Sequence, residues 1–253
     1  CEGLERIIEY ICSMYLLRKC YLLFFIFLFF SASSQSKIEH QNIVWYGYFL
    51  TYPINTNWYL QGEAHERHFL DPILHHQSAF RSHIHRTFGE KWDISAGAAL
   101  FLNTPNDPFA SNRLSIPEYR PHVDIVYKQR ASIFRLDHRF RAEMRFNRGT
   151  DAAKTHLIDA VNFSNYRFRY RIQALFPLFK KVQGKINTEI LLNAAQENPE
   201  NVLDQHRMFA GISIPIRSNL TVDMGYLHAF QQRPNLDYYD RSIISLMIYH
   251  RLK

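Results

Sequence analysis

Apolar and polar side chains alternate at every second position along most of this chain. The segment "FRLDHRFRAEMRF", residues 134–146, shows the pattern most clearly: apolar residues stand at positions 134, 136, 140, 142, 144 and 146, and charged residues lie between them. A helix would repeat its apolar positions every three or four residues, so a period of two indicates a β-strand with one apolar and one charged face.

The same period returns in eleven segments: residues 43–52, 57–67, 76–88, 91–101, 118–127, 132–146, 163–176, 184–192, 205–214, 219–230 and 241–252. Most of them reach the length of about 9 to 11 residues that a tilted strand needs to cross a bilayer. Short turns such as "TFGEK", "YKQRA" and "IRSN" alternate with longer polar loops near residues 102–117, 147–162, 193–204 and 231–239. This alternation is typical of an outer-membrane barrel.

A soluble barrel or sandwich would also show alternating strands, but it would bury the apolar faces. Eleven long strands would bring more aromatic side chains inside than a small barrel can hold. A membrane barrel turns these faces toward lipid and places aromatic residues of the strand ends in interfacial girdles. The candidates for these girdles are Trp45, Trp58, Trp92, Tyr119, Tyr127 and Tyr226.

We therefore predict an all-β fold, a single up-and-down antiparallel transmembrane β-barrel. If both ends of such a barrel lie on the periplasmic side, the number of strands must be even. We expect 10 or 12 strands, so that one of the eleven segments is miscounted or one strand is missed.

The N-terminal part differs in composition from the rest. From Met14 it has a short basic stretch, an apolar run from Tyr21 to Phe30 and then small residues. This order is typical of a secretory signal peptide, and the run is shorter than the ~20 residues that a spanning helix needs. We predict upstream residues and a signal peptide over residues 1–34 and the barrel over residues 35–253, in the outer membrane of a Gram-negative bacterium.

All three cysteines, Cys1, Cys12 and Cys20, lie in the predicted leader. The exported part therefore has no disulfide, no thiolate metal site and no cysteine nucleophile.

The segments "HRFRAEMRF", "YRFRYRIQALFPL", "LDQHR" and "GYLHAF" resemble a bacterial family filed as domain of unknown function 2490 (DUF2490). The resemblance runs over about residues 43–252 and implies an exported outer-membrane barrel, with no catalytic residues to carry over. Many such barrels end on an aromatic residue that the assembly machinery reads, whereas this chain ends in Leu252 and Lys253.

Charged residues on the inward faces of the strands form the main candidate site. The period of two predicts a lumen charge ladder of Arg135, Asp137, Arg139, Arg141, Glu143, Arg145, Arg167, Arg169, Arg171, Glu189 and Arg207. One interpretation is structural, because buried charges must pair with one another. The other is a narrow anion pore or binding site, because arginines outnumber carboxylates in these strands.

The net charge of +7 limits the classes of partner. Nucleic acid is not expected, since an exported chain seldom meets any. We expect outer-membrane lipid, the barrel-assembly machinery and small anions as partners.

Six histidines fall between residues 65 and 85: His65, His68, His75, His76, His83 and His85. His83 and His85 share a strand face and approach His65 or Glu63 across a hairpin, a donor set that suits zinc or copper. Because no spaced ligand motif accompanies them, we expect ordinary lumen and loop histidines, no metal and no cofactor.

Outward polar residues offer an alternative function, a lipid-acting acyl hydrolase. His228 and Ser242 face outward and oppose one another across the 231–239 loop, with Asp240 on the same face. A hairpin estimate places His138, a further outward histidine, near Ile172 and Pro121, without a partner. We expect that the protein is not an enzyme.

Overall fold

The computed structural model describes residues 37–130, 133–194, 201–233 and 235–252. The predicted signal peptide, residues 1–34, lies outside these residues. No helix that is long and apolar enough to cross a membrane occurs in the described part of the chain.

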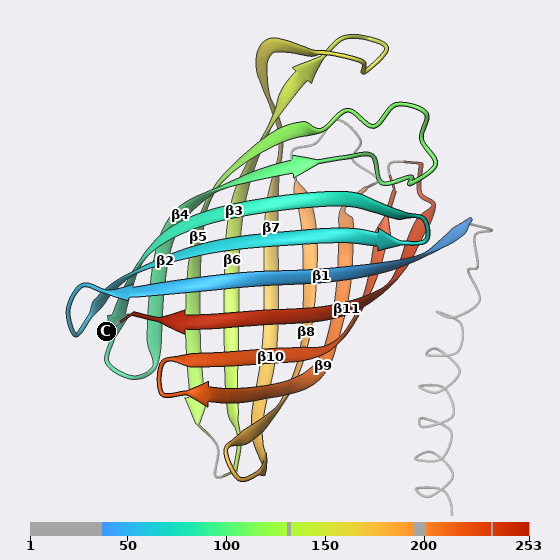
Figure 1. The fold of residues 1–253 in the computed structure, drawn as a ribbon. Coiled ribbons are helices and arrows are strands. Elements are labelled where there is room, and N and C mark those ends of the chain that lie inside the picture. Colours follow the sequence, from blue (N-terminus) through green and yellow to red (C-terminus); the bar gives the residue numbers. More distant parts are fainter. Residues whose placement is uncertain (1–36, 131–132, 195–200, 234, 253) are drawn as a thin grey trace, which may run out of the picture. The chain divides into compact units, whose positions relative to one another are not determined.

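Eleven strands make up nearly all of the described chain (Figure 1). They are β1 (Ile38–Pro53), β2 (Trp58–Leu70), β3 (Ile73–Phe88), β4 (Trp92–Asn103), β5 (Ile116–Arg130), β6 (Arg135–Thr150), β7 (Leu157–Phe179), β8 (Val182–Ala194), β9 (Leu203–Arg217), β10 (Leu220–Gln232) and β11 (Tyr238–Arg251). Each of the eleven segments with period two lies within one of these strands or overlaps most of it, as expected where alternation reflects a pleated strand with two different faces.

The strands close into one barrel in chain order, with β1 next to β11. All neighbours are antiparallel except β1 and β11, which run parallel in a register that pairs Ile43 with Ile243. The predicted all-β barrel is thus confirmed, but the expectation of 10 or 12 strands is wrong, because the described residues form eleven. An even number is required only when every pair is antiparallel, and the parallel closure removes that requirement.

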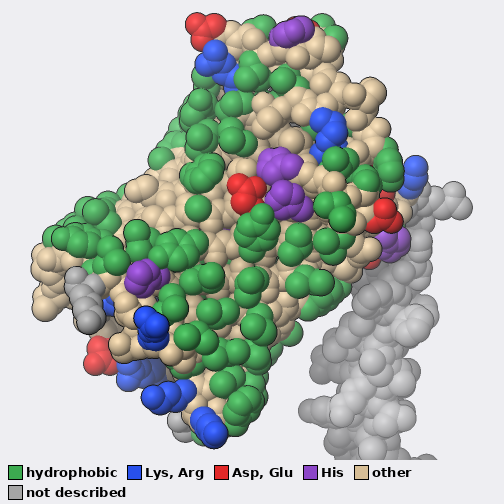
Figure 2. All heavy atoms as spheres, viewed as in Figure 1, with side chains coloured by type: hydrophobic (Ala, Val, Ile, Leu, Met, Phe, Trp, Pro, Cys, Tyr) green, Lys and Arg blue, Asp and Glu red, His purple; other side chains and the backbone are tan. Residues whose placement is uncertain are grey.

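Exposure alternates along each strand between an inner polar face and an outer apolar one. In β6, Arg141 and Glu143 are 6% and 4% exposed, whereas Phe140 and Met144 on the other face are 53% and 38% exposed. Hydrophobic side chains cover much of the outer face in the space-filling view (Figure 2). A soluble protein rarely exposes so large an apolar area, so the exterior is suited to lipid.

The interior is not uniformly charged. Five buried apolar side chains from β1, β2, β10 and β11 form one cluster inside the barrel: Ile43, Phe69, Leu227, Ala229 and Ile243. The charged side chains therefore lie mainly on the inner faces of the other strands, β3 to β9.

The long connection from β4 to β5, residues 104–115, turns back over one mouth of the barrel. Its Asn106 carbonyl oxygen accepts a hydrogen bond from Gln41 Nε2 at 2.8 Å, and its Asn106 Oδ1 accepts one from Arg241 Nη2 at 3.0 Å. These bonds hold the loop against the inner wall at the end where the longer connections lie, which we call the long-loop end.

Candidate functional site in the lumen

All four arginines of the segment 134–146 have a carboxylate partner. The pairs are Arg135 with Asp137 at 2.9 Å, Arg139 with Glu189 at 2.5 Å, Arg141 with Asp124 at 2.6 Å, and Arg145 with Glu118. Asp124 on β5 lies directly opposite Arg141, Glu118 on the same strand lies diagonally across from Arg145, and Glu189 lies on β8, further round the barrel. The arginines of residues 134–146 are therefore all ion-paired on the inner face of the strand.

Glu189 on β8 is the centre of the densest network. Its carboxylate accepts hydrogen bonds from Arg139, and from Arg169 at 2.9 and 3.0 Å, and it lies 3.6 Å from Arg207 Nη1. Arg169 also donates to Glu143 at 2.9 Å. One carboxylate thus holds guanidinium groups from three strands, β6, β7 and β9, which fixes the side chains in the middle of the lumen.

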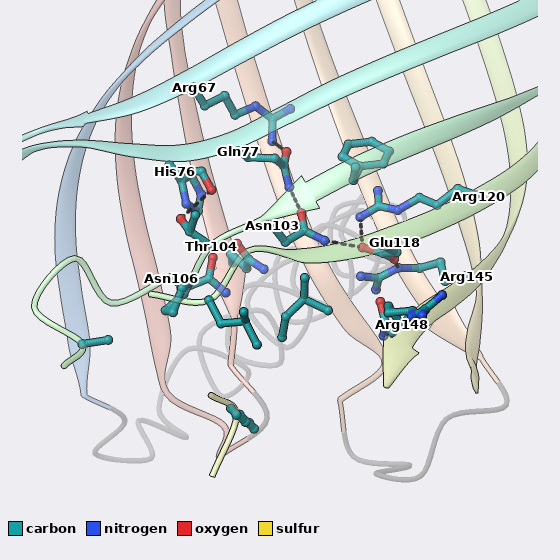
Figure 3. Close-up of a pocket in the computed structure, with 18 of the residues that line it drawn as sticks. Arg67, His76, Gln77, Asn103, Thr104, Asn106, Glu118, Arg120, Arg145 and Arg148 are labelled. Atoms are coloured by element: carbon teal, nitrogen blue, oxygen red, sulfur yellow. Dashed lines mark hydrogen bonds and ion pairs between the residues drawn. The ribbon is translucent and has the colours of Figure 1, made fainter. Parts of the chain in front are cut away.

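Glu118 on β5 is a second carboxylate that binds several side chains, nearer the long-loop end (Figure 3). It is 1% exposed and accepts hydrogen bonds from Arg120 Nη2 at 2.7 Å, from Asn103 Nδ2 at 2.8 Å and from Arg145. Asn103 in turn accepts a hydrogen bond from Gln77. The neutral side chains thus link this carboxylate to strand β3.

Two arginines on the inner strand faces at the same end have no carboxylate within ion-pair distance among the described residues. Arg67 Nη1 donates to Gln77 Oε1 at 2.5 Å, and its guanidinium lies 4.0 Å from the centre of the Trp45 ring. Arg241 donates only to neutral groups, those of Gln41, Asn106 and Gln231. Their positive charges are therefore not neutralised by a side chain in direct contact.

Two large cavities lie in the lumen of the described barrel. The outer one, of about 730 Å³, opens at the long-loop end, and the inner one has about 550 Å³. Three arginines, Arg81, Arg169 and Arg207, line both cavities and therefore lie between them. Arginine side chains thus stand at the boundary between the two cavities.

The lining of the outer cavity is strongly cationic. It includes ten arginine and lysine side chains: Arg67, Arg81, Arg120, Arg145, Arg148, Lys154, Arg167, Arg169, Arg207 and Arg241. Among the described residues Glu118 is the one carboxylate that lines it. A concave site lined by one sign of charge within walls of low dielectric concentrates ions of the opposite sign.

The loop between β6 and β7 contributes Lys154 to this cavity. The carboxylate of Asp151 accepts hydrogen bonds from the backbone N–H groups of His156 and Thr155 at 2.9 and 2.7 Å. These bonds to the charged form hold the pKa of Asp151 below its ordinary value. Lys154 has a φ of 53° in this tight turn, and the hydrogen bonds to Asp151 stabilise the turn.

The eleven residues of the predicted ladder all lie on the inner side of the barrel. Nine take part in the ion pairs and hydrogen bonds described above, and Arg167 pairs with Asp204 at 3.1 Å. Arg171 lines the inner cavity and has no carboxylate within ion-pair distance among the described residues. The ladder did not include Arg67, Arg81 and Arg241, although the period of two in their strands places each of them on the inner face.

The predicted histidine cluster divides into separate groups. His65 and His83 both lie beside Glu63 inside the barrel, at 3.0 and 3.3 Å from its oxygens. His85 pairs with Asp93 instead, at 2.9 Å. The other members, His68, His75 and His76, lie nearer the β2–β3 turn, and the first two of them belong to the outer face.

The residues of the predicted hydrolase site are neighbours on the outer face. His228 and Ser242 are directly opposite in the pairing of β10 with β11, and His228 Nε2 is hydrogen-bonded to Asp240. The Ser242 hydroxyl, however, bonds to the hydroxyl of Tyr226 at 2.8 Å. Among the described contacts none joins Ser242 to His228, so the nucleophile and base required for acyl transfer are not connected.

The closed barrel, with its charged lumen and apolar exterior, is that of a porin-like β-barrel protein, and this fold suggests a location in the bacterial outer membrane. The chain belongs to the family described as Protein of unknown function (DUF2490), whose model matches residues 42–240. The predicted resemblance to this family is thereby confirmed.

A solved structure, that of the NanC porin in a rhombohedral crystal form, has a similar fold. It matches with a TM-score of 0.50 and 10% sequence identity, over 83% of this chain and 99% of the porin chain. At this identity the match shows a common fold only. The comparison with curated proteins finds no match.

Proposed function

We propose that the protein is an outer-membrane barrel of a Gram-negative bacterium whose lumen binds small anions and lets them pass. The observation that carries the proposal is the outer cavity, where ten cationic side chains face one carboxylate. Anion-selective pores use arginine and lysine in this way. Recovery of the folded chain with inner rather than outer membranes would contradict the location.

Arg67 and Arg241 supply the proposed anion site. A buried guanidinium without a counter-charge is costly, and neutral hydrogen-bond partners offset only part of that cost. A small anion that enters from the long-loop end would provide the missing charge. The other guanidinium groups that line the outer cavity pair with carboxylates and shape the passage rather than bind the anion.

The passage is proposed to be narrow. A barrel of eleven strands lies between 8-stranded barrels, which side chains fill, and 16-stranded porins with open channels. The three arginines between the two cavities narrow it further. The competing interpretation is a purely structural ladder, in which the charges pair to stabilise the barrel and no ion passes.

Planar-bilayer recordings of the purified chain test this proposal. In a KCl gradient we expect small conductance steps with a reversal potential that indicates anion selectivity. Substituting Arg67→Gln and Arg241→Gln together removes two charges but orphans no carboxylate, so the barrel remains folded and anion selectivity falls.

The matched control is Arg130→Gln. Arg130 is 78% exposed and pairs with the equally exposed Glu90 outside the lumen, so its replacement leaves selectivity unchanged. Absence of any conductance would favour the structural ladder, and cation selectivity would overturn the proposal.

We further propose that the protein has no catalytic activity and that its partners are outer-membrane lipid at the outer face and the barrel-assembly machinery during insertion. The Ser242 hydroxyl bonds to Tyr226 instead of His228, which supports the first point, since an acyl hydrolase needs its serine hydrogen-bonded to the histidine. Release of fatty acid from phospholipid by the purified barrel would contradict it.

A further inference from the structure

Two histidines from different strands meet inside the barrel over a glycine. His83 on β3, Gly97 on β4 and His122 on β5 lie side by side in register. Gly97 has no side chain, so the two rings approach across β4 to a centroid distance of 4.7 Å. A Cβ at Gly97 would lie 2.2 Å from the Ser82 carbonyl oxygen, so this position requires glycine.

The nitrogen atoms of the two rings lie in a row between two oxygen acceptors. Glu63 Oε1 lies 3.3 Å from His83 Nε2, His83 Nδ1 lies 3.1 Å from His122 Nε2, and His122 Nδ1 lies 3.0 Å from the Arg120 carbonyl oxygen. Both ends of this row are acceptors, because Glu63 is the carboxylate that pairs with Arg81. Two neutral imidazoles carry only two protons for these three contacts, and among the described residues His83 Nε2 has no hydrogen-bond partner, since its contact with Glu63 is an ion-pair distance only.

When each imidazole points its single N–H at its outer partner, the lone pairs of His83 Nδ1 and His122 Nε2 face each other. His122 Nδ1–H then bonds to a backbone carbonyl, and His83 Nε2–H points to a carboxylate. Metal-binding histidines show this arrangement, in which the second ring nitrogen is held by a carbonyl or carboxylate. Two buried lone pairs that face each other at 3.1 Å can share a cation.

Asp124 completes a set of three ligands. Its Oδ2 lies 4.0 Å from His122 Nε2, and one ligand atom from each of His83, His122 and Asp124 lies within 4.8 Å of the other two. The other oxygen of Asp124 accepts from Arg141 Nε at 2.6 Å, which orients the carboxylate. All three ligand residues are buried.

We propose that His83, His122 and Asp124 bind a divalent transition-metal ion. Two imidazole nitrogens and one carboxylate oxygen are a donor set for zinc and for the neighbouring divalent metals. The inner cavity, which His83 and Asp124 line, gives access for the ion and for a water molecule as a fourth ligand. This site differs from the proposed anion site, whose arginines lie in the outer cavity.

Zinc binding to the whole chain tests the proposal. The protein, purified in detergent without a histidine tag and stripped with EDTA, is titrated with zinc chloride by calorimetry, and bound zinc is measured after equilibrium dialysis. We expect one zinc ion per chain. Loss of a ligand in His83→Gln or His122→Gln weakens binding at least tenfold, since even outer-shell changes cost about 10- to 100-fold.

His85→Gln is the matched control. His85 shares the inner face of β3 with His83 but pairs with Asp93 at 2.9 Å, so its loss leaves zinc affinity unchanged. Equal weakening in all three variants, or no stoichiometric zinc, would overturn the proposal.

The nitrogen-15 spectrum of the unsubstituted protein gives a test that does not depend on the variants folding. We expect added zinc to shift two imidazole signals together with a rise in the unfolding temperature. A bridging proton is the rival occupant. It would appear as one imidazolium at neutral pH that zinc does not displace, which overturns the metal site.

Discussion

At the scale of single residues, shared carboxylates decide how the lumen is held. Glu189 neutralises three arginines and Glu118 two, while Arg67 and Arg241 rely on neutral side chains. Removing a shared carboxylate therefore leaves several buried charges uncompensated. Replacing Arg67 or Arg241 by a neutral residue leaves no buried charge uncompensated.

Glu189→Gln is expected to destabilise the barrel strongly. Breaking a buried ion pair from one side typically costs roughly 3–5 kcal/mol, because the remaining charge stays buried. Urea unfolding in detergent, followed by tryptophan fluorescence, measures the change in unfolding free energy. Glu90→Gln, which affects a pair exposed on both sides, serves as the control and is expected to change stability by less than about 0.5 kcal/mol. Similar effects of the two substitutions would show that the lumen pairs are solvated like surface ones.

At the scale of strands, close contact between neighbouring backbones depends on particular glycines. An added Cβ at Gly97 would meet the β3 backbone, whereas nothing lies within 4 Å of the corresponding position at Gly62. Gly97 faces the lumen between the two histidines. Gly62 belongs to the outer face of β2.

Gly97→Ala is expected to destabilise the barrel by roughly 1–3 kcal/mol, the usual cost of forcing an extra methyl into a packed site. Gly62→Ala is expected to be neutral or to stabilise by up to about 1 kcal/mol, because alanine restricts the unfolded chain. Unfolding in urea compares the two variants directly. Equal effects would mean that β3 and β4 separate easily at this point.

At the scale of the whole molecule, the parallel pairing of β1 with β11 closes the barrel. This pairing places Val44 beside Ile244, and the antiparallel pairing of β10 with β11 places Tyr226 beside the same Ile244. Ile244 therefore has a neighbour on each side. Val44 belongs to the parallel pair that closes the barrel, and Tyr226 belongs to the antiparallel β10–β11 hairpin.

A disulfide test distinguishes an eleven-stranded barrel from one with a further strand between β1 and β11. In a chain whose three native cysteines are replaced by serine, Val44→Cys with Ile244→Cys is expected to cross-link on mild oxidation. Neighbouring strands lie about 4.7–4.9 Å apart, within the range that a disulfide spans. Mass spectrometry after proteolysis detects the bond. The pair Tyr226→Cys with Ile244→Cys is the positive control, and its cross-linking without that of the first pair would rule out the parallel closure.

Sequence reasoning succeeded where an element depends on local alternation. The estimate that His138 lies opposite Ile172 is confirmed, because the β6–β7 register follows from the two strands and their loop. The estimate on the other side was wrong: His138 pairs with Tyr127, not Pro121. Strand β5 extends to Arg130, so the turn between β5 and β6 lies further along the chain than the estimate assumed. Moving a hairpin turn by one residue changes the cross-strand partner by two residues.

The alternation of apolar and polar residues determined by itself that the chain forms long strands, which face of each strand is charged, and that the apolar faces need lipid. These properties depend on residues two positions apart in one strand, so they are readable from the chain alone. The tertiary structure alone decided that an odd number of strands closes through a parallel pair, that the arginines of residues 134–146 are all paired while Arg67 and Arg241 are not, and that His83 meets His122 over Gly97. The physical reason is that each of these depends on which strands become neighbours around the barrel, and closure brings together residues that no local pattern relates.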